Sequence, residues 1–341
     1  MFYRFFFAVW TAAFAVGAVH ADPALSRFTF DEKHMGTAFR IIVYAPDEAM
    51  ARKASTAAFA RIADLDATMT DYQETSELMR LCAKSGGDPV HVSDELFFVL
   101  SKAQETSRLS DGAFDVTVGP LVLLWRQARK TKRMPDPEKL AAARDLVGWK
   151  NVVLDEKAHT VQLLKAGMKL DLGGIAKGYA ADEGLAVLKK EGVTRALVAA
   201  GGDIAVSGPP PGAADWKIAI APLKEDADTE GPVMLLHDAA VSTSGDAEQY
   251  VEIDGKRYSH IVDPKTGLGL VGRMSATVVA PHGVIADSHT KIVAVLGPER
   301  AFKILEKEEG ASARFVRLTD DGKEETAVMQ GFPRLTNPKE K

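Results

Sequence analysis

The segment KLDLGGIAKGYAADEGLAVLKKEG, residues Lys169–Gly192, is the most direct indication of how this chain folds. Its first residues predict a strand, its paired glycines a tight turn, and its later apolar residues, at helical spacing, a helix. Outward from this segment, strand and helix patterns follow one another without the regular alternation of βαβ units. We therefore expect an α+β fold rather than a parallel α/β fold.

Further elements are predicted on both sides of the segment. Helices are expected over residues 47–69 and 93–109, the second with Ser93 or Asp94 as its N-cap. A charged, proline-broken surface segment that ends in a short helix is expected over 126–149. A hairpin is expected over 152–164. Short strands are expected over 39–45, 194–200, 216–222, 233–243, 249–255 and 256–263, and a strand, two helices and a strand over 275–318.

The N-terminus differs from the rest of the chain. Residues 1–21, MFYRFFFAVWTAAFAVGAVHA, have the layout of a secretory signal peptide: an early Arg4, an apolar stretch, and small residues before Asp22. An uncleaved membrane anchor is the alternative, although the stretch lacks the length and flanks that an anchor needs. We expect one exported domain, residues 22–341, released in soluble form into the periplasm.

Composition excludes several classes of protein. The formal net charge of -5 over 341 residues gives no basic excess for binding nucleic acid or an anionic membrane. Cys82 is the only cysteine, so an internal disulfide and a site of several thiolates are both excluded. Cys82 lies in an apolar-periodic segment and is expected to be buried.

Two glycine pairs follow apolar runs, in LDLGGIAKGY (170–179) and in AAGGDIAVSG (199–208). Glycines allow a ligand close to the backbone, and a helix N-terminus offers free N–H groups to an anion. Neither pattern is a dinucleotide fingerprint or a P-loop, so a phosphate site and an ordinary tight turn both remain open. The segment GAFDVTVGPLV (112–122) places Asp115 among apolar residues, where either a ligand or a core turn would satisfy it.

Ionisable residues gather in two later segments. YSHIVDPKTG (258–267) places His260 on an expected strand, where it is either a proton carrier or a structural histidine. ADSHTK (286–291) opens a helix on which Asp287, Thr290 and Lys291 share one face. A carboxylate and a hydroxyl suit Mg²⁺, whereas an ammonium has no lone pair to give, so an Asp287–Lys291 ion pair is the competing interpretation.

These segments, in this order, resemble the ApbE family, the FAD:protein FMN transferases. The resemblance runs from about His34 to Arg314. It rests on HMGT, MTDYQETSELMRL, GAFDVTVGPLV, LDLGGIAKGYAAD, AAGGDIAVSG, STSGD, YSHIVDPKTG and VVAPHGVIADSHTKIVAVLG.

The resemblance implies an α+β fold related to the tunnelling fold (T-fold), with FAD between two lobes of one chain. It implies Mg²⁺-assisted transfer of FMN from FAD to a Thr or Ser hydroxyl of an acceptor protein, with release of AMP. The acceptor would be an FMN-binding domain of an electron-transfer complex outside the cytoplasm. Two other activities stay open: Mg²⁺-dependent hydrolysis of FAD to FMN and AMP, and FAD binding without cleavage.

The resemblance also implies roles for individual residues. The expected FAD contacts are Met35, Tyr72, Ala113, Phe114, Asp115, Asp171, Lys177 and Ile261. The expected Mg²⁺ ligands are a carbonyl at or near Gly174, the Asp287 carboxylate and Thr290. His260 is the first candidate for the base and Asp287 the second.

Lys291 departs from the family pattern, in which many members have Thr at that position. Thr290 then supplies the oxygen ligand, or Lys291 contacts a phosphate beside a metal with fewer protein ligands, or its ammonium takes over the role of the cation. Of these, the sequence favours retained dependence on Mg²⁺.

Overall fold

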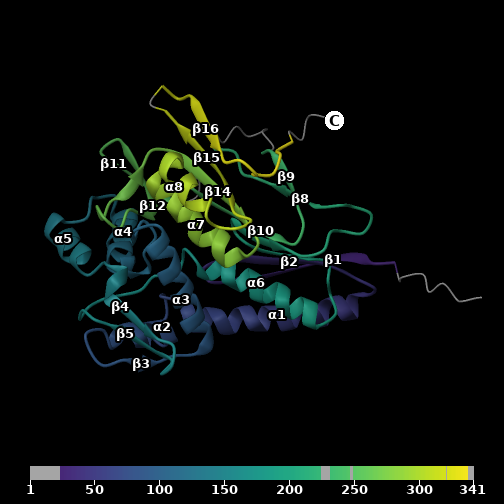
Figure 1. Cartoon of the computed structure of the whole chain (residues 1–341), viewed down its shortest axis with the longest axis horizontal. Coiled ribbons are helices and arrows are strands. Elements are labelled where there is room, and N and C mark those ends of the chain that lie inside the picture. The colour runs from purple at the N-terminus through teal and green to yellow at the C-terminus, as the bar shows by residue number, and fades with distance from the viewer. Residues whose placement is uncertain (1–23, 224–230, 246–248, 320, 337–341) are drawn as a thin grey trace, which may run out of the picture.

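The computed structural model describes residues 24–223, 231–245, 249–319 and 321–336. The predicted signal peptide, residues 1–21, lies outside these ranges. The described chain mixes helices with antiparallel sheets, as Figure 1 shows, which confirms the α+β prediction. None of the helices in these ranges combines the length and the apolarity needed to cross a membrane.

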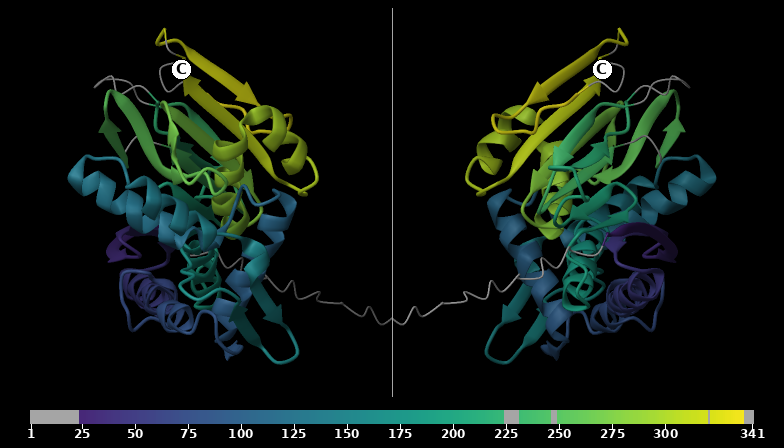
Figure 2. Two further views of the ribbon diagram at one scale, coloured as in Figure 1. Left: turned by 90° about the vertical axis from the view of Figure 1, so that its left-hand side faces the viewer. Right: turned by 90° about the vertical axis from the view of Figure 1, so that its right-hand side faces the viewer.

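An eight-stranded sheet organises the described part of the chain, and its neighbouring strands are all antiparallel. In spatial order its strands are β1 (Ser26–His34), β2 (Thr37–Ala45), β6 (Ala196–Ala200), β7 (Asp203–Val206), β10 (Ala239–Gly245), β14 (Met274–Ala280), β15 (Ser312–Leu318) and β16 (Glu324–Val328). β15 and β16 lie at the end of the molecule opposite α1 (Glu48–Met69) (Figures 1 and 2).

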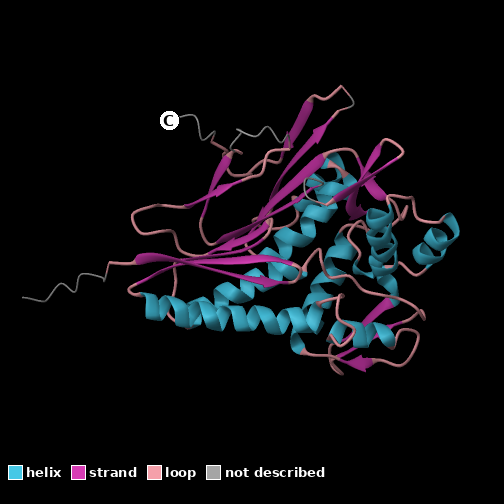
Figure 3. Ribbon diagram, turned by 180° about the vertical axis from the view of Figure 1, so that it is seen from behind, coloured by secondary structure: helices cyan, strands magenta, loops and turns pink. Residues whose placement is uncertain are grey.

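Helices cover one face of this sheet, as the view in Figure 3 shows. Besides α1, the helices that contact its strands are α6 (Ala176–Lys190), α7 (Gly283–Leu296) and α8 (Pro298–Leu305). α2 (Glu77–Ala83) and α3 (Asp94–Leu109) pack beside α1, and α4 (Gly119–Thr131) and α5 (Pro137–Asp145) lie to one side, where α4 packs against β12 (Lys256–Val262). Short 3₁₀ turns are η1 (Val116–Val118) and η2 (Trp149–Asn151). The main core, which includes Phe39, Ile62 and Ile292, fills the space between the helices and the sheet. The predicted N-cap Ser93 accepts a hydrogen bond from the Leu96 N–H.

Smaller sheets flank the large one. β8 (Trp216–Ala219) and β9 (Val233–Leu236) form a hairpin whose side chains share a second apolar cluster with residues of the large sheet, such as Val241 and Val279. β11 (Tyr250–Ile253), β12 (Lys256–Val262) and β13 (Gly269–Val271) form a third sheet, and β3 (Val90–His91), β5 (Thr160–Leu163) and β4 (Val152–Asp155) a fourth.

Helices α6 and α7 cross with their backbones in contact. A Cβ added at Gly178 of α6 would lie 2.0 Å from the carbonyl oxygen of Gly283 at the start of α7, so only glycine fits there. Asp182 of α6 accepts hydrogen bonds from the N–H groups of Gly283 and Val284, at 2.7 and 3.0 Å, and so caps α7. The crossing fixes the position of α7 along α6, and it therefore places Asp287 of α7 next to the N-terminus of α6.

Two sequence expectations are wrong. The segment 233–243, expected as one strand, forms β9 and β10, which belong to different sheets. Lys169–Leu172 forms no strand, because Leu170 N–H bonds to Cys82 Sγ and Asp171 N–H to the Val116 carbonyl instead of to a neighbouring strand. The segment 126–149 is largely exposed and contains the expected short helix, α5, which Pro137 begins at a position where a helix tolerates proline. Its first residues, 126–131, differ from the expectation because they complete α4. Cys82 is buried, as expected.

Candidate functional site

A cavity of about 540 Å³ collects residues from most of the segments that the sequence singled out. Its wall is formed by the β1–β2 turn, the loop after α1, the segment before α4, the loop before α6, the β6–β7 turn and strand β12. The predicted site residues on the wall are Met35, Tyr72, Ala113, Phe114, Asp115, Asp171, Gly174, Lys177, His260 and Ile261. Asp287 and Thr290 lie behind the wall, and both are fully buried.

The β1–β2 turn, which contains the HMGT motif, presents Met35 to the cavity. Met35 and Gly36 have φ of 50° and 73°, the left-handed backbone that a two-residue hairpin turn of type I′ requires. The Met35 N–H donates to Asp66 Oδ2 of α1 at 2.7 Å. This bond holds the turn against the end of α1, where the loop to Tyr72 begins.

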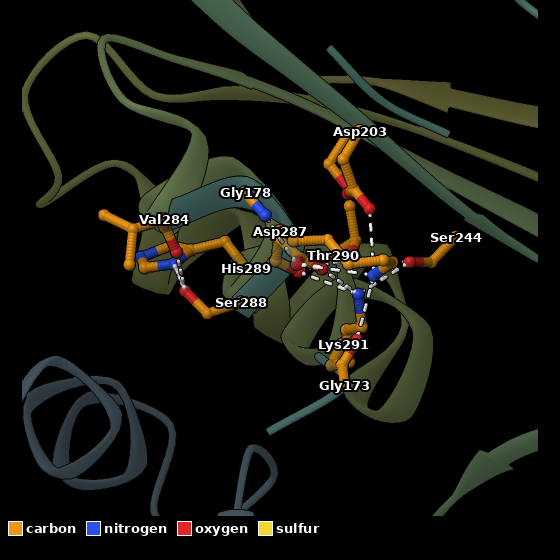
Figure 4. A network of polar contacts seen from close by, with 12 residues as sticks. Gly173, Gly178, Asp203, Ser244, Val284, Asp287, Ser288, His289, Thr290 and Lys291 are labelled. Carbon is orange, nitrogen blue, oxygen red and sulfur yellow. Dashed lines mark hydrogen bonds and ion pairs between the residues drawn. The ribbon is translucent and has the colours of Figure 1, made fainter. Parts of the chain in front are cut away.

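Asp287 is the centre of a buried polar network, as Figure 4 shows. Lys291, one turn later on α7, donates to Asp287 Oδ1, to the Asp287 carbonyl at 3.1 Å and to Ser244 Oγ at 3.0 Å. The Gly178 N–H donates to Asp287 Oδ2 at 3.2 Å, so a free N–H group at the start of α6 binds this carboxylate. Burial raises the pKa of Asp287, but the neighbouring Lys177 and Lys291 outweigh it, and the pKa lies below its ordinary value.

Lys177 joins this network to the β6–β7 turn. Its Nζ lies 2.9 Å from Asp203 Oδ2, 3.5 Å from Asp287 Oδ2 and 2.9 Å from the carbonyl oxygen of Gly173. Burial by itself lowers the pKa of Lys177, but the two carboxylates raise it well above its ordinary range, so the ammonium stays charged. Asp203 is held in turn by Ser242 Oγ at 2.5 Å.

His260 extends from β12 into the cavity wall. Its Nδ1 lies 3.1 Å from the Gln249 carbonyl, which accepts a second hydrogen bond from the His260 N–H at 3.0 Å. Because a carbonyl can only accept, Nδ1 carries the proton and Nε2 keeps a lone pair. Burial, aided by the charges of Lys291, Arg129 and Lys177, lowers the pKa of His260 to about 4, so its imidazole is neutral at pH 7.

Asp115 finds its partners within the protein. Its Oδ1 accepts from the N–H and the hydroxyl of Thr117 at 2.8 and 2.7 Å, and its Oδ2 accepts from the Trp149 N–H at 2.8 Å. Burial raises the pKa of Asp115, and these three hydrogen bonds oppose the increase. The geometry therefore favours the core-turn alternative for the carboxylate, while the residue remains part of the cavity wall.

One side of the cavity carries a residue that sequence reasoning misjudged. Arg126 was expected on a solvated face, yet its side chain is only 21% exposed and contacts Asp71 Oδ2 at 2.6 Å and Asp171 Oδ2 at 3.2 Å. Its guanidinium lies 4.4 Å from the centre of the Tyr72 ring, which is 69% exposed. Burial and Asp71 raise the pKa of Asp171, and Arg126 opposes them. These partners lie 55 and 45 residues from Arg126, too far for any local pattern to indicate.

The predicted metal ligands do not form a set of free oxygens. Donors hold both oxygens of Asp287, and the Thr290 hydroxyl donates to the Asp287 carbonyl at 2.7 Å and pairs with Ser244 Oγ at 2.8 Å. The Lys291 stem lies over Gly174, where an added Cβ would be 3.1 Å from its Cε. Nowhere in the described ranges do three or more His, Cys, Asp or Glu side chains gather as metal ligands would. As the side chains stand, the site does not fit Mg²⁺.

Known proteins resemble the chain over most of its length. The sequence profile of the ApbE family matches residues 35–315. A FAD:protein FMN transferase of Klebsiella pneumoniae (strain 342) is 32% identical over 295 residues, which cover 86% of this chain and 90% of that protein. Another from Haemophilus influenzae is 32% identical over 318 residues, or 90% and 91% of the two chains.

Solved structures agree with the sequence matches. The flavin transferase ApbE from Vibrio cholerae superimposes with a TM-score of 0.81 at 30% identity, covering 90% of this chain and 98% of that one. The apo form of the Pseudomonas stutzeri flavinyl transferase ApbE gives a TM-score of 0.78 at 29% identity, with 90% and 95% covered.

Proposed function

The chain belongs to the ApbE family, and from this membership we propose that it is an FAD:protein FMN transferase. A Ser or Thr hydroxyl oxygen of an acceptor protein attacks the FMN phosphorus of FAD. A phosphoester bond forms to the acceptor, the bond to the AMP phosphate breaks, the hydroxyl proton passes to a base, and AMP leaves. The structural observation that best supports this assignment is the gathering of a neutral histidine, His260, and two lysines, Lys177 and Lys291, in one cavity.

The cavity offers different surroundings to the two ends of FAD. Lys177 and Lys291 bring positive charge to one part of the wall, where the diphosphate would be stabilised as negative charge develops on the leaving AMP. Tyr72 presents an exposed ring and Met35 an apolar side chain on another part, which suits the flavin ring. We place Ala113, Phe114 and Ile261 in the wall around the flavin nucleotide, and Asp171 and Lys177 nearest its phosphates.

His260 is the better of the two candidate bases. Its Nε2 has a lone pair at neutral pH, and the imidazole lines the cavity. Asp287 lies behind the wall, its two oxygens bound by an ammonium and an N–H group, so it cannot reach an acceptor hydroxyl. We assign Asp287 the role of positioning Lys177 and Lys291.

The sequence-based hypothesis included Mg²⁺, which would offset the charge of the diphosphate when bound. Because donors already hold Asp287 and Lys291 covers Gly174, we assign no step of the reaction to the ion. The hydrolase and the FAD-binding protein remain the alternative functions, and they differ from the transferase in whether AMP is released and whether an acceptor is needed.

We also propose that residues 1–21 direct export and that the mature domain, residues 22–341, binds FAD between two lobes in the periplasm. N-terminal sequencing of protein from a periplasmic fraction tests the export. A mature start at Asp22 is expected, and an intact Met1 would contradict it.

The transfer itself is tested on a purified FMN-binding domain from a sodium-pumping electron-transfer complex. After incubation with the enzyme and FAD, flavin fluorescence should stay with the acceptor band on a denaturing gel. An acceptor whose flavinylated Thr or Ser is replaced by Ala should remain dark. Equal labelling of the two acceptors would contradict transfer to that hydroxyl.

A further inference from the structure

Two ammonium groups stand between Asp287 and the cavity. Lys177 and Lys291 both line the cavity wall, whereas Asp287 has 0% of its surface exposed. An anion that enters the cavity therefore meets the two lysines, and Asp287 acts on it only through them. An ammonium has donors and no lone pair, so neither lysine can serve as a metal ligand.

Lys291 also contacts two of the residues that the sequence proposed as metal ligands, Asp287 and Gly174. Its Nζ binds Asp287 and Ser244, and its stem lies against Gly174. A divalent ion that reached Asp287 Oδ1 would have to displace this ammonium from a buried carboxylate. After that exchange the Lys291 ammonium would lie beside the divalent ion, and the repulsion between two positive charges is strong in a site shielded from water.

The charges of the network already balance. Asp203 and Asp287 contribute two negative charges, and Lys177 and Lys291 contribute two positive charges. A divalent cation would add two positive charges with no carboxylate left to offset them. A diphosphate would instead meet the ammonium groups of Lys177 and Lys291 on the cavity wall, where their side chains are 23% and 16% exposed.

We propose that the Lys291 ammonium takes the place of a divalent cation in this protein, so that Lys177 and Lys291 bind the diphosphate of FAD without metal. The inference rests on the proposed function insofar as FAD is the ligand. It makes Lys291 a binding residue, and it makes Asp287 and Ser244 the residues that position its ammonium.

The first test uses Mn²⁺ alone, followed by its electron paramagnetic resonance, and requires no FAD. Wild-type protein should bind no Mn²⁺ at this site, and Lys291→Thr, which frees Asp287 Oδ1, should bind one ion that added Asp287→Asn removes. Mn²⁺ bound to the wild type and lost in Asp287→Asn would overturn the proposal, as would a Lys291→Thr protein that binds none.

The second test measures FAD affinity by flavin fluorescence, in chelator and in Mg²⁺. The affinity of the wild type for FAD should be the same within about twofold in chelator and in Mg²⁺. Lys291→Thr should bind FAD about 10- to 100-fold more weakly than the wild type in chelator, as expected for a lost charged hydrogen bond. Mg²⁺ should restore the affinity of this variant. Lys291→Arg should stay metal-independent, and Lys189→Thr, an exposed lysine of α6, should match the wild type.

The outcomes separate the two proposals. If the wild type binds FAD at least 10-fold better with Mg²⁺ than with chelator, the lysine does not replace the ion, although the transferase function stands. If no FAD binds under any condition, the proposed function fails, and the Mn²⁺ result still decides whether Lys291 excludes a metal. Should Lys291→Thr fail to fold, the two wild-type measurements decide alone.

Discussion

Replacing Gly178 by Ala should damage both stability and activity, because the α6–α7 crossing has no room for a methyl group. The added Cβ would lie 2.0 Å from the Gly283 carbonyl oxygen and 2.8 Å from Asp287 Cβ. Non-bonded contacts need more than about 3 Å, so α7 has to move by roughly 1 Å. Overpacking of this kind costs about 3 kcal/mol or more of unfolding free energy where backbone, rather than a side chain, must shift.

The same shift should impair the reaction. α7 carries Asp287 and Lys291, and a misplacement of about 1 Å in a positioned group can cost about 100-fold in rate. Gly184→Ala is the matched control on the same helix, because the nearest atoms to its Cβ would be side-chain methyl groups of Ile62 and Val198, at 3.4 to 3.5 Å. Removing a mid-helix glycine there should change stability by about +0.5 to +1 kcal/mol.

Urea unfolding and the rate of AMP release, measured on Gly178→Ala and Gly184→Ala, test whether the α6–α7 crossing supports both stability and activity. Gly178→Ala should unfold at lower urea and release AMP at least about 100-fold more slowly, and Gly184→Ala should do neither. A Gly178→Ala protein as stable and active as Gly184→Ala would refute the crossing as the element that positions Lys291.

Three further predictions follow from the site and its surroundings. His260→Gln should lower the rate of AMP release by about 10²- to 10⁴-fold, with the affinity for FAD nearly unchanged. In the wild type, this rate should fall only as pH approaches about 4, where the His260 imidazole becomes protonated. A fall centred near about pH 6.5 would contradict a buried, neutral imidazole. Asp115→Ala should lower the unfolding free energy by about 2–4 kcal/mol, because it leaves the buried donors of Thr117 and Trp149 without an acceptor, and a loss below about 1 kcal/mol in urea titrations would contradict that role. Burial lowers the pKa of His289 to about 4, below the value of about 6.5 that a histidine has in the unfolded chain. Between about pH 6.5 and pH 4 the unfolded chain therefore binds more protons than the folded protein, and the free energy of unfolding decreases as pH falls. His289→Asn should reduce this slope of unfolding free energy against pH, and an unchanged slope would exclude His289 as its source.

The sequence predicted most elements because their signals are local. The helical spacing over residues 47–69 corresponds to α1, and the strand patterns over 249–255 and 256–263 correspond to the β11–β12 hairpin. β1 was missed because its residues are largely exposed and its apolar alternation is limited to Phe28 and Phe30. Lys169–Leu172 looked like a strand, yet its backbone bonds go to Cys82 and Val116, partners that no local pattern reveals.

The sequence indicated most of the residues that lie at the candidate site, but it did not indicate which of them contact one another. The motif segments named most of the residues that line the cavity. The sequence also stated the alternatives for Asp287 and Lys291, and among them it favoured retained dependence on Mg²⁺. The choice depends on α7 lying against α6 and β10, which brings Gly178 and Ser244 to the same carboxylate and ammonium. Arg126 was missed for a similar reason, since both of its acidic partners are remote in the sequence.

The most direct test of the transferase function is AMP release from FAD by the mature protein, measured with and without the acceptor domain. We predict AMP only when the acceptor is present, in an amount equal to the flavin that becomes covalently bound. AMP released at the same rate without acceptor would show a hydrolase, and FAD left intact in both reactions would contradict catalysis altogether.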